Sequence, residues 1–388
     1  MDGVALSTSS RGPRKAPVHT LTTFRFFASL AIVFVHALQS ARYDYLASGV
    51  SFFFILSGFV LTYVHPRIDG GMEFARFWVA RLARIWPLHI FTLVVVLIVQ
   101  PFGRNPFKHF FSEFFLNLFL LQSWAPIRRV AMSFNFVSWS ISVELFFYLV
   151  FPFLLPLVFR MPGKTFLGAV ALYVLVACGG AVLGLPDIKN PGMPSYDAFL
   201  FCPVLHLYQF VLGMAVAVWW TGACQSPKAV ILWSWIEAFV FGAILCLLPS
   251  LENLSLLLVQ GHTEYSIDRQ LTDLLSTPLF ALLIYVFAFQ AGILSRLFSN
   301  AWLVYLGDIS FSTYMIHCII LEPFRSIPLS IPHVLRWSLF GLICFCASGL
   351  LYALLEKPSR KSLVGLADSF FKRVRERCQD AAPLSKPD

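Results

Sequence analysis

Arg25 and His36 stand out because both lie inside the first long apolar run of the chain. Ionisable groups within a membrane span are costly to bury and usually mark a site. Their spacing of eleven residues is almost three helical turns, so one face carries both, about 16 Å apart. An arginine at one mouth and an imidazole near mid-membrane suit a reaction across the bilayer. A snorkelling arginine and a packed, hydrogen-bonded histidine are the alternative.

A second basic group, Arg76, Arg81 and Arg84, begins another apolar run. Arg81 and Arg84 are three residues apart, so a helix places them on one face. Guanidinium groups bind phosphates in a two-pronged fashion. The pair therefore indicates a phosphate-bearing ligand such as cytoplasmic acyl-CoA. The alternative is that these charges only orient the helix.

Glu144 lies just inside a further apolar run, after Trp139 and a series of serines. Tyr148 follows one helical turn later and shares its face. The carboxylate could orient an imidazole, accept a proton or pair with an arginine. A structural hydrogen bond between helices is the competing interpretation.

Ser310, Tyr314 and His317 form a polar stripe near the end of the sequence, and Asp308 lies near its start. The spacing of four and then three residues places the three side chains on one helix face. Such a stripe is as typical of contacts between helices as of the lining of a pathway.

The eight cysteines do not indicate a metal site. Most lie within apolar runs, and they show no Cys-x-x-Cys pair and no zinc-like spacing to histidine. We interpret them as small apolar residues of helix interfaces. We expect no metal and no bound cofactor.

The composition predicts that lipid is part of the solvent. Apolar residues make up 58% of the chain and charged residues only 13%, against about 45–50% and about 25% in soluble domains. The net charge of +9 could suggest nucleic acid. Because the basic residues lie in loops between apolar runs, membrane orientation explains them better, and we expect no nucleic-acid partner.

The apolar runs predict an all-α integral membrane protein, a bundle of about ten transmembrane helices. The predicted spans are residues 21–38, 46–64, 82–101, 141–159, 166–185, 198–220, 229–248, 274–294, 302–321 and 334–355. Residues 109–124 are apolar but short and contain Glu113, which is typical of an interfacial or re-entrant segment. A polar tail (1–20) precedes the transmembrane domain (21–360), and a basic tail (361–388) follows it.

The distribution of charge predicts the orientation of the bundle. With ten spans and an inward N-terminus, about twice as many basic residues face inward as outward. This bias predicts a multi-pass protein of the plasma membrane with both termini in the cytoplasm. The longest outward loop, residues 249–273, has four acidic residues and one basic residue. We expect it to form a lid on the outer side.

Taken together, these segments resemble the acyltransferase-3 family of bacterial membrane O-acyltransferases, which modify surface polysaccharides. The matching segments are residues 21–28 with His36, 49–59, 81–87, 139–148, 306–310 with Tyr314 and His317, and 356–358. They occur in family order and cover residues 21–360. Residues 166–294 match only as hydrophobic spans. We expect no fused extracytoplasmic hydrolase-like domain, which some relatives carry.

The resemblance implies transfer of an acyl group, acetyl above all, from cytoplasmic acyl-CoA to a hydroxyl of a surface or exported glycan. By this resemblance Arg25, Arg81 and Arg84 hold CoA phosphates. His36 acts as general base or carries the acyl group briefly. Glu144 sets the tautomer of the imidazole. The remaining residues expected to line the site are Trp139, Tyr148, Asp308, Ser310, Tyr314 and His317.

Two alternatives remain open from the sequence. The acceptor could be a small glycoside, such as an antibiotic sugar. The chain could instead be a proton-coupled secondary transporter that uses Arg25, His36 and Glu144, although no inverted repeat supports it. The glycerolipid acyltransferase motif and the Gly-x-Ser-x-Gly elbow are both absent from the sequence.

Overall fold

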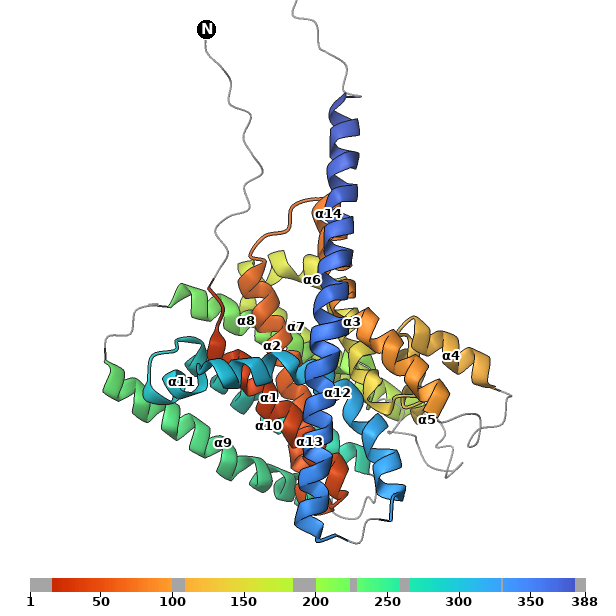
Figure 1. Cartoon of the computed structure of the whole chain (residues 1–388). Coiled ribbons are helices and arrows are strands. Elements are labelled where there is room, and N and C mark those ends of the chain that lie inside the picture. The colour runs from red at the N-terminus through yellow and green to blue at the C-terminus, as the bar shows by residue number, and fades with distance from the viewer. Residues whose placement is uncertain are drawn as a thin grey trace, which may run out of the picture.

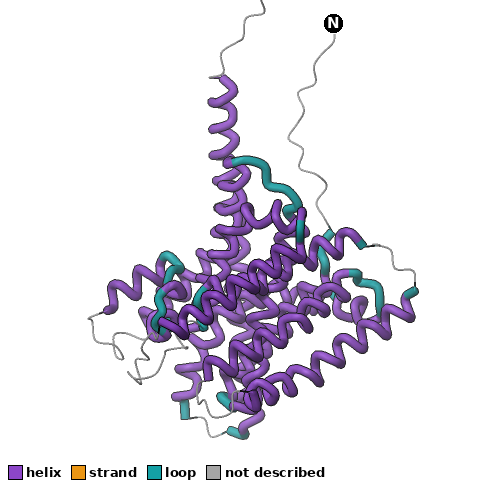
Figure 2. Tube along the Cα trace, turned by 180° about the vertical axis from the view of Figure 1, so that it is seen from behind, coloured by secondary structure: helices purple, strands orange, loops and turns teal. Residues whose placement is uncertain are grey.

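The computed structural model describes residues 16–99, 109–183, 200–223, 229–258, 265–328 and 331–380. Most of these residues are helical and none of them lies in a strand (Figures 1 and 2). Ten of the described helical segments are long and apolar enough to cross a membrane. The predicted all-α membrane bundle of about ten helices is therefore confirmed.

The spanning segments contain ten α-helices. These are α1 (His19–Leu38), α2 (Gly49–Val64), α3 (Gly71–Val99), α6 (Trp139–Arg160), α7 (Pro162–Leu183), α8 (Leu207–Gly222), α9 (Val230–Leu258), α10 (Tyr265–Ala288), α12 (Ala301–Ser326) and α13 (His333–Leu351). Shorter helices lie between them: α4 (Phe110–Leu118), α5 (Arg128–Ala131) and α11 (Ile293–Phe298). The nine residues of α4 are too few to span, as expected for the segment 109–124.

The predicted outer loop 249–273 is wrong as a loop. α9 continues to Leu258 and α10 begins at Tyr265, so most of this stretch is helical. The leucine-rich sequence after Pro249 favours continued helix. A hydrogen bond of 2.8 Å between the Ser255 and Thr272 hydroxyls joins the two helices.

The C-terminal part of the chain extends the last span. α13 passes through one π-helical turn, Tyr352–Glu356, into α14 (Lys357–Asp380). Figure 1 shows α14 rising beyond the bundle, with its lower part beside α3. Residues 361–380 of the predicted basic tail therefore form a helix.

α1 and α12 pack side by side and run in the same direction. Near their starts, a Cβ atom added to Gly307 would lie 1.9 Å from the carbonyl oxygen of Thr22. Further along, His36 meets His317. Only glycine allows this backbone contact, since any side chain would push the helices apart.

The core of the bundle joins α2 to α8 and α3 to α6. Gly58 and Gly213 let α2 and α8 approach so closely that an added Cβ would lie 2.0 Å or less from a backbone oxygen of the other helix. The Trp78 indole on α3 donates a hydrogen bond of 3.0 Å to the carbonyl oxygen of Tyr148 on α6. These contacts bring the polar residues of α1, α3, α6 and α12 to the centre of the bundle.

Candidate active site

A cavity of about 320 Å³, here termed the central cavity, opens among the helices. One end of its wall is formed by the residues before α1 and by the end of α2. There the Tyr63 hydroxyl of α2 donates a hydrogen bond of 2.9 Å to the carbonyl oxygen of Ala16. It ends at Phe53, Ser140 and Tyr314. The wall is mostly apolar, and the charged residues that line it are Arg25, Arg84 and Glu144. The cavity thus offers positive charge and a long apolar surface together.

The three predicted arginines come together in the structure, and we term Arg25, Arg81 and Arg84 the arginine cluster. Arg25 and Arg84 line the central cavity. Arg81 lies beside it against the ring of Phe77, 5.7 Å from the ring centroid, and its buried Nε has no hydrogen-bond partner. Within the described part of the chain, no ion pair or hydrogen bond neutralises these guanidinium groups directly.

Acidic groups surround the arginine cluster at longer range. Asp308, Glu144 and Glu356 interact electrostatically with both Arg25 and Arg84. Glu356 is buried, and one of its oxygens accepts a hydrogen bond of 2.7 Å from Ser312. Glu356 belongs to the segment 356–358 that matched the family pattern. It is the last residue of the π-helical turn between α13 and α14, and no local sequence pattern predicted this turn.

The charge of the arginine cluster also reaches a neighbouring loop. His65 follows α2, outside the membrane-spanning segments. Burial, and then the positive charge of Arg81, lower the pKa of His65 to about 4. The imidazole is therefore neutral at physiological pH and adds no charge to the cluster.

Glu144 lines the central cavity but does not orient His36, so this part of its predicted role is wrong. Its carboxylate accepts a hydrogen bond from the Tyr148 hydroxyl and a longer one, at 3.4 Å, from Ser57. Tyr148 lies one helical turn from Glu144, and its hydroxyl, not an imidazole, is the partner of the carboxylate. Glu144 faces the arginine cluster instead, which was one of the alternatives considered for it.

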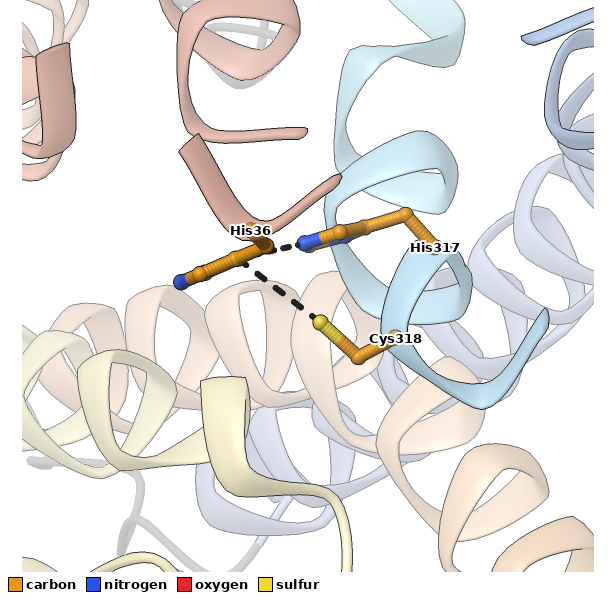
Figure 3. A group of neighbouring side chains, drawn as sticks. All are labelled: His36, His317 and Cys318. Carbon is orange, nitrogen blue, oxygen red and sulfur yellow. Dashed lines mark hydrogen bonds between the residues drawn. The ribbon is translucent and has the colours of Figure 1, made fainter. Parts of the chain in front are cut away.

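His36 pairs with His317 across the contact between α1 and α12. Its Nδ1 lies 2.9 Å from Nε2 of His317 (Figure 3). His36 lies in the last turn of α1, two residues before the helix ends, and its partner lies nine residues before the end of α12. Arg325 donates hydrogen bonds to the carbonyl oxygens of His36 and Ala37, which closes the end of α1.

Cys318 is a neighbour of His36 that sequence analysis missed. Its Sγ lies 3.7 Å from Nδ1 of His36, and one donor atom from each of His36, His317 and Cys318 lies within 4.8 Å of the others. Such a group of donor atoms is able to hold a metal ion, although the sequence predicted none. The spacing signal was absent because 281 residues separate the two histidines.

The predicted polar stripe of α12 divides into separate contacts. Tyr314 lines the end of the central cavity, and its hydroxyl bonds the Ser140 hydroxyl at 2.8 Å. The Tyr314 ring also lies 6.0 Å from the ring of His317, between centroids, so it stands between the cavity and the histidine pair. Ser310 is buried and donates to the carbonyl oxygen of Gly307 in its own helix.

Trp139 does not line the central cavity. Its ring packs against Phe54, Phe201 and His206, with centroid distances of 5.0–6.2 Å. Trp139 begins α6, and its indole turns toward α2 and the residues before α8. Its predicted place in the lining of the site is therefore wrong for this cavity.

Three known proteins that are similar to this chain are named as acyltransferases or O-acetyltransferases. Acyltransferase MdmB of Streptomyces mycarofaciens is 27% identical over 391 residues, covering 90% of this chain and 94% of that protein. A Bacillus subtilis protein with the provisional name peptidoglycan O-acetyltransferase YrhL is 26% identical over 216 residues, covering 52% of this chain and 33% of that protein. A Staphylococcus aureus protein provisionally named as an O-acetyltransferase is 24% identical, covering 81% of this chain and 52% of that protein. No solved structure matches the chain.

The family model described as an acyltransferase domain matches residues 18–355. This range begins just before α1 and ends within the π-helical turn after α13, so it contains the arginine cluster, Glu144 and the histidine pair. The chain belongs to the acyltransferase-3 family of membrane acyltransferases, as its sequence motifs indicated.

Proposed function

We propose that this enzyme moves an acetyl group from acyl-CoA to a hydroxyl of a surface or exported glycan. The observation that carries the proposal is the arginine cluster beside the central cavity. Guanidinium groups that lie together without a direct ion pair repel each other, and an anion bound between them relieves this repulsion beyond what the more distant carboxylates provide. CoA supplies several phosphate charges, and its thin pantetheine arm suits the apolar wall of the cavity.

The chemistry proposed for the site is direct acyl transfer with His36 as general base. Nε2 of His36 removes the proton of the acceptor hydroxyl as the oxygen attacks the thioester carbon. A C–O bond forms, the C–S bond breaks, and the CoA sulfur leaves with the proton that His36 returns. His36 does not line the central cavity, so the thioester has to pass the ring of Tyr314, at the end of the cavity, to reach it.

The proposed orientation places the arginine cluster toward the cytoplasm of a bacterial cell. The wall of the central cavity starts at the residues before α1, on the side of the bundle where α14 emerges. The bias of basic residues predicts that this side faces the cytoplasm, where acyl-CoA is found. His36, at the opposite end of α1, then lies nearer to an acceptor on the outer side.

The support for a glycan acceptor is the name of the Bacillus subtilis relative, which refers to peptidoglycan. The shared segment includes about half of this chain. A carbohydrate hydroxyl is a weak nucleophile, so it requires a base such as the imidazole of His36.

Calorimetry on purified protein tests the donor site. Wild type should bind CoA, and binding should weaken as salt is raised, because phosphate contacts are screened. Arg84→Ala should weaken binding about 10–100-fold, the value of a lost charge-assisted hydrogen bond. Arg84→Lys should restore only part, since a point charge does not reproduce a guanidinium fork.

The matched control is Arg296→Ala, which removes an exposed arginine of α11. It should leave CoA binding unchanged. Absence of CoA binding by the wild type at either salt concentration would rule out the acyl-CoA donor and favour a transporter.

A further inference from the structure

The hydrogen bonds of His317 determine which of its ring nitrogens carries a proton. Its Nδ1 lies 2.7 Å from the carbonyl oxygen of Tyr314 and 3.2 Å from that of Thr313. A carbonyl oxygen only accepts, so Nδ1 of His317 must be the N–H donor. In the neutral ring, Nε2 of His317 is then an acceptor with its lone pair directed away from its own backbone.

This lone pair points at His36. Nε2 of His317 lies 2.9 Å from Nδ1 of His36, and the two rings are 8° from coplanar with centroids 5.2 Å apart. The distance between the ring centroids is longer than the distance between the two nitrogens by about two imidazole radii, one for each ring. Both nitrogens must therefore lie on the line that joins the two centroids. That is the geometry of a straight N–H···N hydrogen bond. Nδ1 of His36 is the donor.

The second nitrogen of His36 is thereby left as the base. Nε2 of His36 has no hydrogen-bond partner among the described residues. It is also absent from the fully buried polar atoms that lack a partner, so the atom is accessible rather than enclosed. Figure 3 shows it pointing away from His317 and Cys318. A neutral imidazole with its proton on Nδ1 presents an unprotonated Nε2, which is the form a general base requires.

We infer that His317 is a positioning residue that holds His36 in the tautomer with a free, basic Nε2. The carbonyl oxygens of α12 orient His317, and His317 orients His36, in the manner in which a carboxylate orients the histidine of a catalytic triad. The inference rests on the proposed function, since it assigns to His317 the role that the sequence had assigned to Glu144. Both histidines need no net charge, which suits a site inside a membrane.

A metal ion is the competing explanation for this group of side chains. In a tetrahedral zinc site, with Zn–N bonds of about 2.0–2.1 Å, two imidazole nitrogens lie about 3.3 Å apart and their lone pairs converge on the metal. Here the nitrogens are closer, at 2.9 Å, and the rings are aligned with each other. Cys318 is buried among apolar residues, which disfavours the thiolate that zinc prefers.

Nitrogen NMR of the protein in nanodiscs, labelled with ¹⁵N-histidine, tests the tautomer directly. The His36 signals are identified by their loss in His36→Gln. Wild type should show the proton of His36 on Nδ1, and His317→Leu should abolish this preference. A wild-type His36 with its proton on Nε2, or a tautomer that is unchanged in His317→Leu, would overturn the inference.

Kinetics tests the consequence for transfer. His317→Leu should lower kcat about 100-fold at unchanged KM for acyl-CoA, because the base is disoriented while the donor site is intact. His317→Gln should recover at least a tenfold part, since its amide oxygen can accept from Nδ1 of His36. A glutamine variant as poor as the leucine variant would overturn the inference. Thermal unfolding identifies a variant that fails to fold, and the glutamine variant then decides.

Cys318→Ala and metal analysis separate the histidine pair from a metal site. The alanine variant should keep kcat within a few-fold, and purified wild type should be active without bound zinc or copper. Stoichiometric metal that is lost in Cys318→Ala, together with inhibition by a chelator, would overturn the inference. If wild type transfers no acyl group at all, the proposed function fails, while the NMR result still decides the tautomer.

Discussion

Two carboxylates within membrane spans, Glu237 and Glu144, have opposite environments. Glu237 on α9 is fully buried and accepts hydrogen bonds from the backbone nitrogens of Gly292 and Ser295 at 2.7 and 2.9 Å, and from the Ser295 hydroxyl. It closes the start of α11, and an added Cβ on Gly292 would lie 2.4 Å from it. Both carboxylate oxygens of Glu237 thus accept hydrogen bonds from the protein itself.

Glu144 is satisfied only in part. It accepts from Tyr148 and more weakly from Ser57, and it borders a cavity that also holds two arginines. A buried charge whose partners are supplied by the backbone stabilises the fold, whereas one that faces a cavity is available to a ligand. Residue type alone therefore does not separate a structural carboxylate from a functional one in this protein, whereas the source of the hydrogen-bond donors does.

The largest loss of activity should come from His36, which lies beyond Tyr314 at the end of the cavity that Glu144 borders. His36→Ala should abolish acyl transfer, with a fall of about 1000-fold or more, because no other described group occupies the place of the base. The measurement is transfer of labelled acetyl in membranes with matched amounts of protein. His109→Ala removes an exposed histidine of the chain and should leave transfer unchanged. Wild-type transfer by His36→Ala would remove this histidine from the mechanism.

Glu144→Gln should lower acyl transfer about 10–100-fold with little change in thermal unfolding. Glutamine keeps the volume and one acceptor for Tyr148, but it removes the negative charge opposite Arg25 and Arg84. Transfer per folded molecule and the unfolding temperature are measured on the same preparation. A fall in stability without a fall in activity would place Glu144 with Glu237 and break the comparison.

Glu237→Gln should have the smallest effect on transfer and the opposite pattern. The amide nitrogen of the new glutamine faces a backbone N–H that had donated to the carboxylate, so this N–H loses its acceptor. The loss costs about 1–3 kcal/mol of stability. Thermal unfolding in detergent should shift downward, and transfer per folded molecule should match the wild type. A specific loss of transfer at unchanged stability would show that α9 and α11 also serve the site.

The sequence predicted the bundle well because each span is a local property. Long apolar runs must be helices in lipid, and the arginines and histidines inside them were visible without any knowledge of packing. The same reasoning overlooked Glu237, although it also lies within a predicted span. Its partners, Gly292 and Ser295, lie more than fifty residues away, and no nearby motif pointed to it.

The partners within the site were harder to predict than its members. Arg25, Arg84 and Glu144 were predicted and do meet at one cavity. The pairing of His36 with Glu144 was wrong, because a helix face specifies a direction and not the neighbour found there. His317 is that neighbour. The close contact of Gly307 with Thr22 brings α12 near enough to α1 for the two histidines to meet.

The close contact of α1 with α12 has a consequence for biosynthesis. α1 is the first span to leave the ribosome, and His317 follows His36 by 281 residues. The face of α1 around Thr22 must therefore remain in the bilayer without α12 beside it until the ninth span has been inserted. A chain truncated before Gly307 retains the arginine cluster but has no partner for His36. Synthesis that stops early therefore leaves both the wall of the central cavity, which includes Phe311 and Tyr314, and the histidine pair incomplete.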